Sequence, residues 1–75
     1  MDNKILNELE RYKGELVAHC NKILDMVAET RRDEDVNDKE VSRYLNELLL
    51  RASSTQSDIV HVNRRIDAIK TKRRV

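Results

Sequence analysis

The chain has no proline, no tryptophan and no phenylalanine, and Gly14 is its only glycine. Proline and glycine are the residues that most often interrupt helices and form tight turns, so their scarcity favours a helical chain. A domain of this length buries only about 60% of the surface that its unfolded form exposes. We therefore expect an all-α domain of marginal stability, poor in aromatic residues.

Long apolar runs are also missing. The longest is residues 48–50, whereas a helix that spans a bilayer needs about 20 apolar residues. Cys20 is the only cysteine, so no disulfide can form within the chain. The first residues lack the basic start, apolar stretch and cleavage site of a signal peptide. We expect a cytoplasmic protein that does not cross a membrane.

Charge is abundant but unevenly placed. The net charge of the chain is +1. Residues 1–40 carry seven Lys/Arg against eleven Asp/Glu, a net charge of −4, and residues 41–75 carry eight Lys/Arg against three Asp/Glu, a net charge of +5. This separation favours antiparallel packing of one half on the other, or head-to-tail pairing of two copies.

The most regular feature is an apolar stripe that repeats at alternating steps of four and three residues. It consists of Val41, Leu45, Leu48, Ala52, Thr55, Ile59, Val62, Ile66 and Ile69. This spacing predicts a coiled-coil-like helix over four heptads, and another helix must lie along it for the stripe to be buried. The Ser/Thr-rich residues 53–58 leave open a third helix that begins at Ser54 or Ser57. The unbroken phase favours one helix with a possible bend at 53–57.

The N-terminal part predicts a helix over about residues 4–31, followed by a charged turn at about 32–37 and a second helix at about 38–72. Asn37 and Glu40 have the spacing of a capping box at the start of the second helix. The apolar stripe of the first helix is wider than one neighbour would cover. We therefore predict a single domain over residues 1–75, an antiparallel two-helix hairpin that assembles into a four-helix bundle. Gly14 indicates either an uncompensated helix position or the close approach of a partner backbone.

The sequence shows no catalytic, cofactor or metal site. Cys20, His19 and His61 provide neither the number nor the spacing of ligands that zinc requires, and we expect a half-buried His19 and an exposed His61. The acidic cluster of the turn lacks the glycine and distal glutamate of an EF-hand loop. Cys20 lies mid-helix, where the helix dipole does not activate a thiol. We expect a protein that is not an enzyme and uses no cofactor.

Residues 42–46, Ser-Arg-Tyr-Leu-Asn, resemble the Ser-Gln-x-Leu-Asp motif of small helical-hairpin aspartyl-phosphate phosphatases. Arg43 and Asn46 replace the glutamine and aspartate on which that motif depends, so the resemblance does not extend to the activity. The size and the two-helix layout are also similar to those of small co-chaperones of secretion needle subunits, an analogy of architecture alone.

The second helix has apolar side chains outside this regular stripe, and exposed apolar area on a small domain often marks a binding site. For contact with a partner we single out Tyr44, Leu49, Leu50 and Val60, with Arg64, Arg65, Arg73 and Arg74 as a basic rim. The predicted function is a non-catalytic protein–protein interaction module, such as an adaptor, co-chaperone or regulator, that packs against amphipathic helices of a partner or of a homodimer. The alternative is a nucleic-acid-binding regulator that uses the basic C-terminal end.

Overall fold

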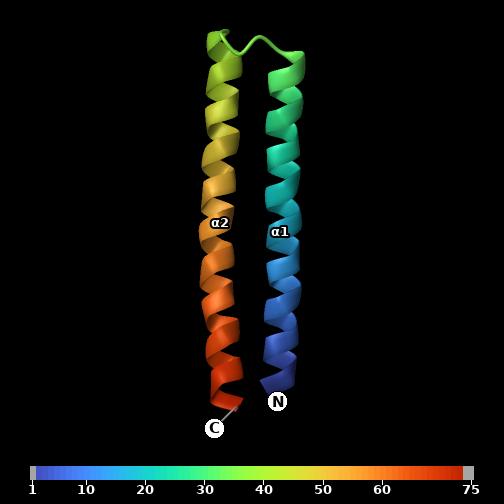
Figure 1. Cartoon of the computed structure of the whole chain (residues 1–75), viewed down its shortest axis with the longest axis vertical. Helices are drawn as coiled ribbons and strands as arrows, with labels where there is room; N and C mark the ends of the chain where they lie inside the picture. Colours follow the sequence, from blue (N-terminus) through green and yellow to red (C-terminus); the bar gives the residue numbers. More distant parts are fainter. Residues whose placement is uncertain (1, 74–75) are drawn as a thin grey trace.

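The computed structural model describes residues 2–73, and the side chains of residues 4–72. These residues form two antiparallel helices, α1 (Asp2–Asp33) and α2 (Lys39–Arg73), which lie side by side in a hairpin with both chain ends at the same end (Figure 1). The hairpin measures 56 × 14 × 14 Å. The predicted all-α hairpin is confirmed. Residues 53–58 are helical and continuous with the residues on either side, so the separate third helix is wrong.

The regular apolar stripe of nine residues from Val41 to Ile69, from here on called the α2 seam, faces α1 along the length of the hairpin. Six of its nine side chains are buried, and Val41, Ile59 and Ile69 are half-buried. The core is formed where Leu45, Leu48 and Ala52 meet the C-terminal half of α1. The packing of α2 therefore follows the period that the sequence predicts.

The covered side of α1 repeats with the same period. Its buried and half-buried positions at alternating steps of three and four residues, here called the α1 seam, are Leu6, Leu9, Lys13, Leu16, Cys20, Ile23, Val27 and Thr30. Lys13 and Thr30 are polar, and for that reason a search for apolar residues alone misses the regularity. Of the other apolar residues of α1, Met26 is half-buried and packs against the core, whereas Ile5, Tyr12, Val17 and Leu24 stay exposed on the hairpin.

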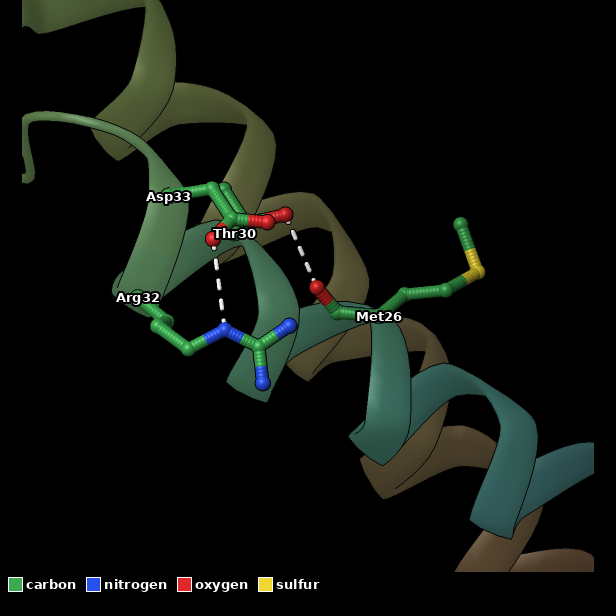
Figure 2. Close-up of polar contacts among 4 residues, drawn as sticks. All are labelled: Met26, Thr30, Arg32 and Asp33. Carbon is green, nitrogen blue, oxygen red and sulfur yellow. Dashed lines mark hydrogen bonds and ion pairs between the residues drawn. The ribbon is translucent and has the colours of Figure 1, made fainter.

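The threonines of the two seams satisfy their hydroxyl groups within their own helices. Thr30 Oγ1 donates to the carbonyl of Met26 at 2.8 Å, near the exposed Arg32–Asp33 pair (Figure 2). Thr55 Oγ1 donates to the carbonyl of Arg51 at 2.9 Å in the same way. Each bond runs back four residues, a common way for threonine to occupy a helix interior. Among the described residues, no buried side-chain nitrogen or oxygen lacks a partner.

The start of α2 is capped by Asp38 instead of the predicted Asn37. Asp38 Oδ1 accepts the backbone N–H groups of Glu40 at 2.8 Å and Val41 at 3.4 Å. Asn37 belongs to the turn before the helix, where its backbone N–H donates to Asp35 Oδ1 at 3.0 Å. This local turn of Asp35 uses Asn37 as a turn residue, so the next residue with a short acidic side chain becomes the cap.

Candidate helix-packing surface

The hairpin leaves much of its apolar side-chain surface exposed. Among the residues whose side chains are described, the exposed large apolar ones are Ile5, Tyr12, Val17, Leu24, Val36, Tyr44, Leu49, Leu50 and Val60. Exposed apolar residues that gather on one face usually mark an interaction site. The first question is therefore which of them share a face.

Four of these residues directly follow a seam residue. Val17 follows Leu16 and Leu24 follows Ile23 on α1, whereas Leu49 follows Leu48 and Val60 follows Ile59 on α2. Because successive helix residues are separated by about 100°, such a residue lies immediately beside the seam, always on the same side of its own helix. Residues three or four positions along the helix extend the same side.

An ion pair shows that these two helix sides lie on the same side of the hairpin. Lys70 Nζ lies 3.5 Å from Glu10 Oε1, and the two residues directly follow the seam residues Ile69 and Leu9. Val17 and Leu24 therefore share one long face with Leu49. Both charged side chains of the pair are about half exposed, so the pair contributes little to stability.

The middle of this face carries no charged residue, and we call it the neutral flank. It consists of Gly14, Val17, Asn21, Leu24 and Ala28 on α1 and Asn46, Leu49, Ser53, Gln56, Val60 and Asn63 on α2. All are exposed except Asn63, which is half-buried. Over the same length the opposite flank carries five charged residues, namely Glu15, Lys22, Glu47, Arg51 and Asp58. In a chain with 39% charged residues, the neutral flank is the face best suited to being covered by another protein.

The structure separates the four predicted contact residues. Leu49 and Val60 lie in the neutral flank, whereas Tyr44 directly precedes a seam residue and lies on the opposite flank. Leu50 points away from α1 and is 70% exposed. It lines a shallow, open hollow beside the turn together with Val36 and Arg43. Val17 and Leu24 belong to the face but were not predicted as contacts. The signal that could have found them is the absence of charge around them.

The predicted basic rim is also divided. Arg64 lies on the outer side of α2, while Arg65 directly precedes Ile66 and lies on the opposite flank. The side chain of Arg73 and all of Arg74 lie outside the described residues. Arg64 and Arg65 therefore do not form one basic rim beside the neutral flank.

Charge varies strongly along the length of the hairpin. The turn end, residues 29–40, carries three Lys/Arg against six Asp/Glu (−3). The opposite end, which we call the terminal end and which comprises residues 4–13 and 61–72, carries seven against three (+4). The middle section between them carries three against four (−1). The molecule is therefore acidic at one end, basic at the other and nearly neutral between.

The residues considered for chemistry do not come together. His19 is exposed, so its expected half-buried position is wrong; it precedes Cys20 and points to the opposite flank. Cys20 is buried, with its Sγ 4.0 Å from the carbonyl oxygen of Ala52. Within residues 2–73, no group of three or more His, Cys, Asp or Glu side chains could hold a metal ion. Neither helix, over the same residues, is apolar enough for long enough to cross a bilayer.

Comparison with known proteins provides no relative: no protein family matches the chain, and no curated protein or solved structure shows significant similarity to it.

Proposed function

We propose that the chain is a non-catalytic protein–protein interaction module, an adaptor, co-chaperone or small regulator, that packs its neutral flank against amphipathic helices. The observation that carries this proposal is the exposure of Val17, Leu24, Leu49 and Val60, at 37–47%, within a face that has no charged residue. An amphipathic helix binds such a face by laying its apolar side along it. The proposal includes a cytoplasmic location, where a single reduced cysteine is ordinary.

The architecture suits this role because each of the two helices contributes one row of side chains to the neutral flank. Helices in bundles pack by placing the side chains of one helix between those of its neighbours, at interaxial distances of about 8–10 Å. The neutral flank takes side chains from both helices of the hairpin, so an added helix can pack against both. An added helix or helix pair would then complete a three- or four-helix bundle.

The test is a charge introduced into the face. The double substitution Leu24→Glu/Leu49→Glu places a carboxylate on each helix of the neutral flank, and Leu50→Glu places one on the outer side of α2 as a matched control. All three side chains are exposed, so far-UV circular dichroism should show unchanged helicity for both variants. Binding to the chain's own copies or to another protein should be lost in the double variant and kept in Leu50→Glu. Binding that is insensitive to both variants would contradict the proposal.

A second candidate, binding to nucleic acid, is supported by the net charge of +4 at the terminal end. Against this candidate, the side chains of Arg64, Arg65 and Lys70 point in different directions, and Lys70 is paired with Glu10. Phosphate contacts make affinity fall steeply with salt, by a slope close to −0.9 for each contact with duplex DNA. Titration of the chain against duplex DNA at rising salt, with Arg64→Ala/Arg65→Ala as the variant, tests this candidate. Absence of binding at low salt would exclude it.

A further inference from the structure

We propose that the occupant of the neutral flank is a second copy of this chain, aligned so that the turn end of each hairpin lies beside the terminal end of the other. This inference rests on the proposed function, because it names the partner of the same surface. The result is a four-helix bundle with a two-fold axis through the middle of the neutral flank.

Two symmetric alignments can bring two neutral flanks face to face. A two-fold axis parallel to the hairpins places turn end beside turn end and packs α1 of one copy on α2 of the other. A two-fold axis perpendicular to the hairpins, in the plane of contact, places the turn end beside the terminal end. It packs α1 on α1 and α2 on α2. Both make all neighbouring helices antiparallel, so helix packing alone does not choose between them.

The net charges of the two ends of the hairpin favour one of these alignments. The parallel axis would place the −3 turn ends side by side and the +4 terminal ends side by side. The perpendicular axis places each −3 end beside a +4 end, with the nearly neutral middle sections in contact at the centre. Complementary charge across an interface favours the correct alignment, and like charges in contact disfavour the other. The perpendicular axis is therefore the favoured one.

The arrangement of side chains on α1 is self-complementary about Asn21. A two-fold axis near this residue places Val17 of one copy opposite Leu24 of the other, and Gly14 opposite Ala28. On α1, apolar residues thus meet apolar residues, and the smallest residues meet where the two α1 helices must come close. Gly14 has open space around it, because a Cβ built on its backbone meets no atom within 4 Å. The glycine therefore has no role within the hairpin and gains one in the dimer.

The shape of the face suits a second hairpin. The hairpin is 56 Å long and 14 Å wide, so a second copy matches the side that it would cover in both length and width. A single partner helix would cover a narrower strip of this face. A second hairpin of equal length and width covers the whole side.

The first experiment measures mass in solution by sedimentation equilibrium over a series of concentrations. The expected result is a dimer of about 17.6 kDa, twice the 8.8 kDa of one chain. Leu24→Glu, which enters the interface twice, should raise the dissociation constant on the order of 100-fold or more, as for central interface residues. Leu50→Glu should leave it unchanged. Affinity should fall as salt rises, because the attraction between the unlike ends is screened.

The second experiment tests the alignment. Asn21→Cys in a Cys20→Ala background should form a disulfide between copies under mild oxidation, because the proposed axis passes near residue 21 on both α1 helices. Ala18→Cys in the same background, on the outer side of α1, is the control and should not. A dimer that cross-links through neither residue and tightens as salt rises would overturn the alignment.

The outcomes separate this inference from the proposed function. A chain that stays monomeric up to millimolar concentration overturns the second copy as partner. If another protein then binds and Leu24→Glu/Leu49→Glu abolishes that binding, the interaction module stands with a different partner. A dimer that is insensitive to Leu24→Glu overturns the second copy as occupant of the neutral flank. The proposed function is overturned as well only if the binding of other proteins is insensitive to Leu24→Glu/Leu49→Glu.

Discussion

Leu48 and Leu50 allow a direct test of the hairpin, because they are the same residue type two positions apart with opposite environments. Leu48 is 4% exposed in the α2 seam, whereas Leu50 is 70% exposed on the outer side. Replacement of either by alanine deletes three carbon atoms. At about 0.8 kcal/mol for each buried carbon, Leu48→Ala should lower the free energy of unfolding by about 2.4 kcal/mol. Because less than a third of its surface is covered, Leu50→Ala should cost no more than about 0.7 kcal/mol.

The open sides of the two-helix core place the Leu48 value at the low end of the range measured for buried leucine. Neighbouring side chains can shift toward the gap, and water can reach it, so little cavity remains. The loss is still large for this chain, since domains have about 0.05–0.15 kcal/mol of stability per residue. For a domain of 60–100 residues it corresponds to a fall in Tm of about 10–20 °C.

Urea denaturation followed by circular dichroism at 222 nm measures both variants. The measurement should be made at several protein concentrations, so that a contribution from dimerisation appears as a concentration-dependent midpoint. The reasoning would be refuted by equal destabilisation in the two variants, or by a larger effect of Leu50→Ala. Either result would mean that the seam is not the core of the folded chain.

Three further predictions concern single positions. Gly14→Ala should raise the free energy of unfolding of the dilute chain by up to about 1 kcal/mol, because alanine favours the helix and its Cβ meets open space; a thermal melt that shows a decrease would contradict this. Asp38→Ala should lower the free energy of unfolding by about 1 kcal/mol, because it removes the carboxylate that caps α2. Asn37→Ala should change it by less than about 0.5 kcal/mol, because the Asn37 side chain does not accept the capping hydrogen bonds. Chemical denaturation of the two variants compares these values. Cys20 should react with a thiol reagent far more slowly in the native chain than in urea, because its Sγ is buried; comparable rates would show that the hairpin opens readily.

Much of the fold could be predicted from residue spacing alone. The nine residues of the α2 seam keep their phase through the Ser/Thr-rich segment, and this regularity correctly favoured one continuous helix over two. The low helix propensity of the Ser/Thr-rich segment favours a break, but burial of Ala52 and Thr55 against α1 outweighs it. Small and polar residues remain in the helix because they fill a seam position and, for Thr55, bond back to Arg51.

The first helix was harder to predict because its seam is not wholly apolar. Lys13 occupies a seam position, where a long side chain can bury its methylene groups and keep its ammonium group at the edge. Thr30 occupies another and bonds to Met26 within the helix. A pattern of apolar residues therefore appeared too wide, and it mixed seam residues such as Leu16 with exposed ones such as Val17.

The sequence by itself determined that two amphipathic helices form and that each has one side to bury, because these properties depend on residue type and on the 3.6-residue period alone. Only the tertiary structure decided which remaining sides of the two helices lie together. That choice depends on the antiparallel direction of the two helices and on the rotation of each about its own axis, which the Glu10–Lys70 contact shows. It joins Val17 and Leu24 with Leu49 and sends Tyr44 to the opposite flank. A surface that combines side chains of two helices therefore depends on how the helices pack, and the residue spacing within one helix does not predict it.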